Sequence, residues 1–270
     1  MSTFSRLTGL ILFLTLVLST ITAREPAANQ TQPSDSAVHI TIIYDNYKFN
    51  PSLQPDWGFA CMVEYLGNRL LFDTGRVLEI YRKNAQALHI QPADFPSLFI
   101  SHAHGDHTAG IPWVLEENPS INCYLPSTYE EQLKSRGQLP TNHKGFDTPA
   151  HMYGPFYSTG DHFKAFNEQG LVIKTDKGGI LVTGCGHPGV VEMVMAAKEG
   201  LGIDVYAVIG GLHLMNTPAE KLEEIARSLK ELGVRKICPT HCTGDQAIDL
   251  FKVSFEEGYI AGGTGRDLTF

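Results

Sequence analysis

Six consecutive residues, His102 to His107, place three histidines and an aspartate one residue after the apolar run Leu98–Ile100. Side chains alternate between the two faces of a strand, so His102 and His104 point to the same side and can bind one ion. Asp106 and His107 lie just beyond and can turn toward a second position. Imidazole nitrogens and carboxylates are ligands that suit Zn²⁺. The motif therefore requires a fold in which a buried strand ends at a metal site.

The first half of the chain alternates between strand and helix patterns. Branched and aromatic residues between turn formers predict strands at residues 38–44, 59–66, 69–72 and 98–100. Apolar residues at helical spacing predict helices at residues 77–88, 108–116 and 128–136. Residues 139–154 show neither period, and we expect them to form a long loop over the site.

The second half repeats this alternation. Residues 171–174 and 180–183 flank a turn at 176–179 and predict a hairpin. Further strands are predicted at residues 204–209 and near Ile237, and helices at residues 190–198, 218–232 and 245–257. Strands that begin each half and helices that follow them predict an α/β fold, with two mixed sheets stacked on each other and flanked by helices. Periodicity alone leaves other α/β arrangements open.

The N-terminal residues have the pattern of a secretory signal peptide. One basic residue precedes an uncharged, apolar stretch from Leu7 to Ala23, which ends in a small residue. We expect a signal peptide at residues 1–23, a flexible linker at 24–37 and the folded domain at 38–270. The alternative is an uncleaved membrane anchor, because the apolar stretch is near the lower length limit for crossing a bilayer.

Cleavage at this point bears on partners and on cysteine chemistry. A chain without residues 1–23 carries 20 basic and 29 acidic residues, a net charge of −9, which argues against a nucleic-acid partner. We expect an exported protein, periplasmic or secreted, that acts on a small molecule and has no stable membrane association; its oligomeric state stays open. The five cysteines can form disulfides in an oxidising compartment, and their odd number leaves at least one unpaired.

Several motifs together resemble one enzyme family. The H-x-H-x-D-H run and the FDTG turn at residues 72–75 are similar to hallmarks of the metallo-β-lactamase superfamily. Within it, the chain resembles the group named for the dihydropterin and ribofuranosylaminobenzene phosphate synthase of the methanopterin pathway. The shared stretches are YDN (44–46), EQGL (168–171), TGCGHPG (183–189), IGGLHL (209–214) and PTHCTG (239–244). The resemblance spans most of residues 38–270 and implies an αββα sandwich in which Asp73 supports the metal-binding loop.

The resemblance also implies two sets of metal ligands, for zinc at about two ions per chain. The first ion is expected to bind His102, His104 and His187. The second ion is expected to bind Asp106, His107 and His241. For the third histidine of the first set, His162 and, further off, His151 compete with His187, because the usual third-motif histidine of the family precedes the hairpin.

Two further residues keep alternatives open. Cys185 falls where many relatives place a bridging aspartate, so it is either a thiolate ligand or a small buried residue or half of a disulfide. His213 follows a buried strand, precedes a helix and has glycines close by. It is either a proton donor or substrate contact in the metal cavity or a core histidine that bonds to the backbone.

Hydrolysis is the expected reaction, with Asp106 and His213 as its catalytic residues. Divalent ions lower the pKa of water toward about 7 and polarise carbonyl or phosphoryl oxygens, so esters, lactones, amides and phosphoesters are compatible substrates. A transferase like the synthase is one alternative, and it needs an aromatic slot. Candidates for that slot are Trp57, Phe59, Tyr153 and Phe156. A protein that retains metal without turnover is another alternative. The signal peptide favours the exported hydrolase, because the synthase's substrates are intracellular.

Overall fold

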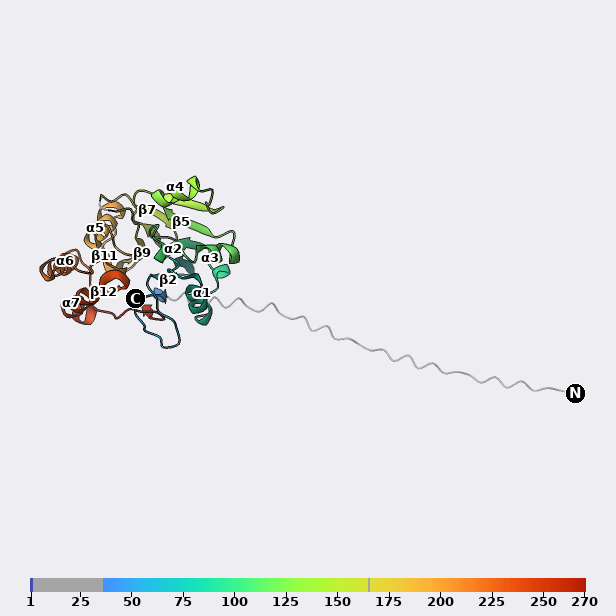
Figure 1. Ribbon diagram of the computed structural model, residues 1–270, viewed down its shortest axis with the longest axis horizontal. Coiled ribbons are helices and arrows are strands. Elements are labelled where there is room, and N and C mark those ends of the chain that lie inside the picture. Colours follow the sequence, from blue (N-terminus) through green and yellow to red (C-terminus); the bar gives the residue numbers. More distant parts are fainter. Residues whose placement is uncertain (2–35, 165) are drawn as a thin grey trace. The chain divides into compact units, whose positions relative to one another are not determined.

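The computed structural model describes Met1 and residues 36–164 and 166–270 (Figure 1). The expected signal peptide at residues 1–23 and the linker at 24–37 lie outside the described residues, apart from Met1 and residues 36–37. Both therefore stay predictions. Among the residues that are described, no helix is long and apolar enough to span a bilayer.

Seven strands form the first sheet, in the order β13-β1-β2-β3-β4-β5-β6. Their bounds are His39–Tyr44 (β1), Ala60–Tyr65 (β2), Asn68–Phe72 (β3), Ser97–Phe99 (β4), Asn122–Pro126 (β5), His143–Phe146 (β6) and Asp267–Thr269 (β13). Strands β13 to β3 pair in antiparallel fashion, whereas β3 to β6 are parallel. The sheet is therefore mixed, and its parallel part carries β4 into the histidine motif.

Six strands form the second sheet, in the order β12-β11-β10-β9-β8-β7. Their bounds are Ala150–Tyr153 (β7), Phe156–Ser158 (β8), Leu171–Thr175 (β9), Gly178–Thr183 (β10), Val205–Gly211 (β11) and Lys236–Thr240 (β12). Strands β10, β11 and β12 are parallel, and the remaining pairs are antiparallel. The parallel strands all end on the same edge of the sheet, where their following loops meet.

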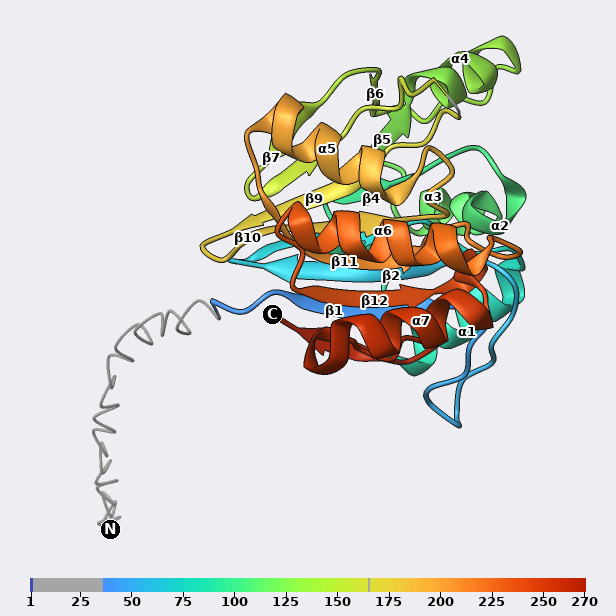
Figure 2. The ribbon, with the colours of Figure 1, turned by 90° about the vertical axis from the view of Figure 1, so that its left-hand side faces the viewer.

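Helices cover the outer face of each sheet. The first sheet packs against α1 (Leu78–Ala87), α3 (Ile111–Glu117) and α4 (Ser127–Ser135). The second sheet packs against α5 (Val190–Leu201), α6 (Ala219–Glu231) and α7 (Asp245–Phe255), which lie next to one another in Figure 2. A one-turn helix, α2, spans Gly105–Thr108, and short 3-10 helices span Pro92–Asp94, His241–Thr243 and Glu256–Gly258.

The core between the sheets follows from the alternation of side chains along the strands. Ile40 and Ile42 of β1 and Phe72 of β3 point into the same cluster as Ile180 and Val182 of β10. All five side chains are fully buried, and each apolar side chain removed from water stabilises the fold by about 1.5–3 kcal/mol. The predicted fold class, two mixed sheets flanked by helices, is confirmed.

Two local predictions were wrong. Residues 139–154 were expected to be a loop, but they contain β6 and β7, which are edge strands with exposed residues and therefore lack the apolar alternation of a buried strand. The helix expected at residues 108–116 is divided at Gly110, where a Cβ atom would lie 2.6 Å from the Tyr81 ring. None of the five cysteines forms a disulfide, and all five are buried.

Candidate metal centre

The candidate ligands follow the ends of strands from both sheets. β4 of the first sheet leads into residues 100–107 and into the short helix α2. From the second sheet, β10, β11 and β12 lead into residues 184–187, 212–213 and 241–243. The parallel pairing of these strands places their carboxyl ends at one edge, which is where open sheets commonly bind ligands. Residues more than 80 positions apart in the chain thus meet.

Three histidines form the first donor group. His104 Nδ1 lies 3.0 Å from His102 Nε2 and 3.2 Å from His187 Nε2, so the three nitrogens converge. Burial lowers the pKa of His102, and burial together with the neighbouring histidines lowers that of His187 to about 4. Neutral imidazoles keep the lone pairs that a cation needs. The ring of Phe166, 4.3 Å from that of His187, forms an apolar wall beside this group.

Four side chains form the second donor group. Cys185 Sγ lies 3.2 Å from His107 Nε2 and 3.4 Å from His241 Nε2. Asp106 Oδ2 is 3.6 Å from both of these nitrogens. A tetrahedron whose centre is 2.0–2.3 Å from its corners has edges of about 3.3–3.8 Å, so the four atoms have the spacing of ligands around one zinc ion. Of the alternatives for Cys185, the geometry favours the thiolate ligand.

Asp73 holds the histidine motif in place from β3. Its carboxylate accepts hydrogen bonds from the Ser101 N–H and hydroxyl, each at 2.7 Å, and from His107 Nδ1 at 2.7 Å. The bond to Nδ1 leaves Nε2 of a neutral His107 ring with its lone pair toward the donor group. Asp73 itself has φ of 51°, a left-handed conformation that aspartate tolerates better than most residues. The predicted supporting role of Asp73 agrees with this geometry.

His241 is positioned by the YDN segment after β1. Asn46 Oδ1 lies 2.9 Å from His241 Nδ1, and Asn46 Nδ2 donates to the His241 carbonyl at 3.1 Å. The neighbouring Asp45 accepts a hydrogen bond from the Thr240 hydroxyl at 2.5 Å. His241 has φ of 51°, in the left-handed region that few residues other than glycine adopt, and these contacts hold it there.

Glu168 is a functional residue that the sequence analysis did not single out. Its buried carboxylate accepts four backbone N–H bonds, from Gly184, Cys185 and Gly186 on Oε1 and from His187 on Oε2, at 2.8–3.1 Å. Burial raises the pKa of Glu168 to about 7, although these bonds act in the opposite direction. Glu168 therefore fixes the loop that carries Cys185 and His187. The shared EQGL stretch was the available signal.

A shallow, open cavity of about 560 Å³ borders the Asp106 side of the second donor group. It is lined by Trp57, Arg76, Gly105, Asp106 and Ala109. The Trp57 ring lies 5.0 Å from that of His241, and Asp106 keeps 18% of its side chain exposed. A substrate in this cavity would meet an aromatic ring, a guanidinium group and the Asp106 carboxylate.

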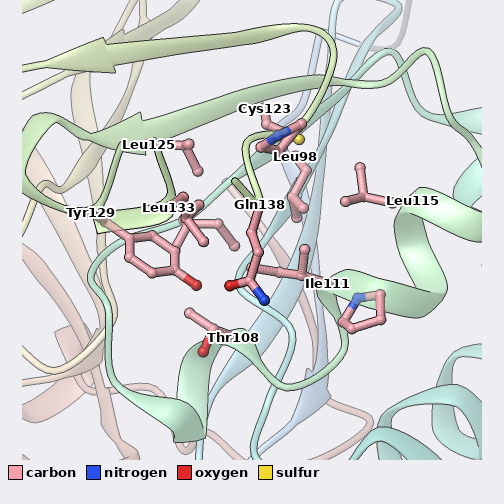
Figure 3. A pocket seen from close by; sticks show the side chains of 12 residues that line it. Leu98, Thr108, Ile111, Leu115, Cys123, Leu125, Tyr129, Leu133 and Gln138 are labelled. Carbon is pink, nitrogen blue, oxygen red and sulfur yellow. The ribbon is translucent and has the colours of Figure 1, made fainter. Parts of the chain in front are cut away.

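A second cavity, of about 310 Å³, lies away from these donors between α3, α4 and the β4 and β5 strands (Figure 3). Its walls are mostly aliphatic, and Figure 3 shows Thr108, Tyr129 and Gln138 as its polar groups. None of the predicted metal ligands lines it. This cavity therefore is not part of the candidate centre.

The remaining candidates are placed as follows. His213 is exposed, with its ring 4.2 Å from that of His187, so it lies at the rim of the centre and is not a core histidine. His162 and His151 are exposed and lie outside both donor groups. Of the three candidates for the third histidine of the first group, His187 is the one that lies beside His102 and His104.

The aromatic slot expected for a transferase was largely wrong. Phe59 and Phe156 are fully buried in the core between the sheets, and Tyr153 packs against that core. Inward positions on strands account for this, because their side chains face the opposite sheet. Only Trp57 of the four reaches the centre, and Phe166 is the second aromatic residue there.

Comparison with known proteins decides the family. The model of the metallo-beta-lactamase superfamily matches residues 59–200, slightly more than half of the chain. The chain belongs to this superfamily. One curated relative is 29% identical to this chain, and the match covers 85% of this chain and 95% of the relative. This relative is the 7,8-dihydropterin-6-methyl-4-(beta-D-ribofuranosyl)-aminobenzene-5'-phosphate synthase of Methanocaldococcus jannaschii.

Solved structures agree with this membership. Tm1679, described as a metal-dependent hydrolase of the beta-lactamase superfamily, is 25% identical and has a TM-score of 0.68, with 86% of this chain and 98% of that chain covered. Zn²⁺-bound PqqB from Methylobacterium extorquens is 10% identical and has a TM-score of 0.55, with 85% of this chain and 99% of the PqqB chain covered. This likeness shows a shared fold. Superfamily membership together with the His, Cys and Asp donors makes this chain a metal-dependent enzyme.

Proposed function

We propose that this protein is an exported hydrolase that uses a metal-activated water to cleave an ester, lactone, amide or phosphoester bond. The observation that carries the proposal is the second donor group, in which Asp106, His107, Cys185 and His241 are spaced for one divalent ion and Asp106 lines an open, shallow cavity. The likeness to a metal-dependent hydrolase supports it. Bound divalent ions would supply Lewis acidity and a nucleophilic water at neutral pH.

Asp106 has the central part in this proposal. One of its oxygens lies 3.6 Å from both His107 Nε2 and His241 Nε2, and its carboxylate is part of the cavity lining. A carboxylate at this place accepts a hydrogen bond from the attacking water and orients it toward the substrate. Its negative charge also offsets part of the cation charge that the histidines cannot neutralise.

His213 is the proposed proton donor. It lies on the loop after β11, is exposed, and has φ of 52°, a left-handed conformation that directs the chain beside His187. An exposed imidazole at the rim can reach the leaving group of a bound substrate and give it a proton. His102, which is fully buried, cannot do this.

The cavity lining favours a small substrate with an anionic group. Arg76 is exposed at the opening, and a guanidinium group binds carboxylate or phosphate oxygens in a bidentate manner. Trp57 offers an exposed ring for stacking against a planar part of the substrate. The negative net charge of the chain argues against a polyanionic nucleic acid.

A transferase activity is the second candidate. The observation that favours it is the 29% identity with the Methanocaldococcus synthase over most of both chains. Trp57 and Phe166 border the centre and supply aromatic surfaces that a pterin-like ring system needs. The same donor groups then position the substrates, and no water attacks.

One experiment on the zinc-loaded chain separates these activities. We would assay bis(4-nitrophenyl) phosphate, 4-nitrophenyl phosphate, an aryl ester and a lactone for hydrolysis, and a dihydropterin with ribofuranosylaminobenzene phosphate for transfer. The hydrolase proposal predicts turnover of at least one hydrolytic substrate, and loss of turnover on chelation. Pterin transfer without hydrolysis would identify the transferase. Full zinc content with neither activity would identify a protein that retains metal without turnover.

Export gives a further prediction, which rests on the sequence alone. If residues 1–23 are removed, mass spectrometry of the protein from its native source should find an N-terminus near Arg24 in a periplasmic or secreted fraction. A chain that retains Met1 in a membrane fraction would contradict cleavage and favour the anchor.

A further inference from the structure

A third cluster of donor atoms lies beside the two groups described above. One side-chain donor atom each from Cys185, His213 and Cys242 lie within 4.8 Å of one another. Cys242 and His213 belong to neither of the other groups, whereas Cys185 also faces His107 and His241. Cys185 is thus the common member, and Cys242 and His213 are two donors that the proposed reaction does not use as ligands.

The backbone holds these three residues together. Cys242 Sγ lies 3.4 Å from the Cys185 carbonyl oxygen, and the Leu212 N–H donates to the Thr243 hydroxyl at 3.1 Å, which fastens the loop of His213 to the turn of Cys242. Gly211 lies between them, and a Cβ atom there would come within 2.8 Å of Cys242 Sγ. Only glycine lets the two loops approach this closely.

Burial and exposure in this cluster suit the entry of an ion. Cys185 and Cys242 are each 3% exposed, so their sulfur atoms are shielded from water. His213 is exposed and forms the outer side of the cluster. An ion can therefore arrive along His213 and bind sulfur in a nearly dry environment.

We propose that Cys185, His213 and Cys242 form a third cation position, which takes a thiophilic ion such as Zn²⁺, Cd²⁺ or Cu⁺. Two sulfur donors and one imidazole are a soft set, which hard cations such as Mg²⁺ and Ca²⁺ do not prefer. The Cys185 thiolate bridges this position and the second donor group. Because it shares the Cys185 thiolate with the second donor group and brings a further cation close to the other two, the third position binds more weakly than they do and fills last.

Occupation of this position has a consequence for catalysis, and this consequence rests on the proposed function. A His213 imidazole that binds a cation through its ring nitrogen no longer carries that proton to a leaving group. Excess thiophilic ion therefore inhibits the hydrolase. The cation position itself does not depend on the reaction.

The test uses Cd²⁺, whose bonds to thiolates absorb in the ultraviolet. The metal-free, reduced full-length chain is titrated with Cd²⁺, and bound ions and absorbance are measured together. The wild type should bind three ions per chain, and the third should add the absorbance of a second thiolate. Cys242→Ser should bind two ions and lack all of the absorbance that the third ion adds to the wild type. Cys238→Ala, which removes a buried thiol from β12 outside the cluster, should behave as the wild type.

A second variant guards against misfolding of Cys242→Ser. His213→Asn changes an exposed residue, and asparagine tolerates its left-handed φ of 52°. It should retain the first two ions and bind the third at least tenfold more weakly. Three ions with full absorbance in Cys242→Ser, or only two ions in the wild type, would overturn the third position. Neither outcome depends on turnover, so the proposed hydrolase would remain to be judged separately.

Discussion

Asp106→Asn should lower kcat on the order of 10²-fold or more, while the three-histidine group keeps its ion. The substitution preserves the shape of the side chain but removes its negative charge. Asp106 Oδ2 lies 3.6 Å from two imidazole nitrogens of the second donor group and is the one carboxylate in that group. Asparagine would leave the cation less neutralised and would orient an attacking water less well. Turnover, metal content and Tm should be measured on the same preparation.

The matched control for this variant is Asp204→Asn. The Asp204 side chain is 75% exposed and pairs with Lys198 on the surface. Asp204 precedes β11, so it lies at the opposite end of this strand from the donor groups. It should turn over as the wild type does. If Asp106→Asn also turns over normally with full metal content, Asp106 has only a structural role and the hydrolase mechanism is wrong.

Asp73→Ala should produce the largest loss of stability among the residues around the centre. Asp73 is fully buried and accepts three hydrogen bonds, one of them from His107. Removing one partner of a buried pair typically costs ~3–5 kcal/mol. For a domain of this size that is a fall in Tm of about 6–20 °C. The melting should be compared in metal-free protein, so that lost metal binding does not contribute.

Asp73→Asn separates the hydrogen bonds from the backbone strain at this residue. Asparagine tolerates φ of 51°, keeps an acceptor for the Ser101 N–H and loses the charge opposite His107. It should therefore melt between the wild type and Asp73→Ala. An alanine variant that melts together with the wild type would show that Asp73 does not hold the histidine motif.

The parts of the fold that the sequence predicted well are those with strong local patterns. β1, β4 and β10 are buried on both faces or nearly so, and their continuous apolar runs marked them. β6, β8 and β13 were missed because they are only three or four residues long or lie at an edge. These segments are strands because neighbouring strands pair with them, and the sequence of so short a segment does not show which partner it has.

The candidate centre shows the same division. Four of the ligands are close together in the chain, so their spacing alone predicts a shared site: His102, His104, Asp106 and His107. The sequence leaves the role of Cys185 open, because its distance from His107 depends on how the two sheets stack and its distance from His241 on the strand order of the second sheet. The support from Glu168 is also hidden in the sequence, because its four bonds go to residues 16–19 positions further along the chain, beyond the paired strands β9 and β10.

The wrong aromatic slot has a similar cause. Phe59 and Phe156 are in apolar segments, and nothing in the sequence says which face of a strand meets the opposite sheet. Both side chains turned out to be inside. Phe166 follows no recognisable pattern, yet its ring lies 5.2 Å from that of His104.

The central claim is that two adjacent donor groups each hold one divalent ion, and anomalous diffraction from zinc-loaded crystals tests it most directly. At low free zinc, the wild type should show one peak among His102, His104 and His187 and another among Asp106, His107, Cys185 and His241. His241→Ala should keep the first peak and lose the second. A single peak in the wild type, a peak elsewhere, or two unchanged peaks in His241→Ala would contradict the account.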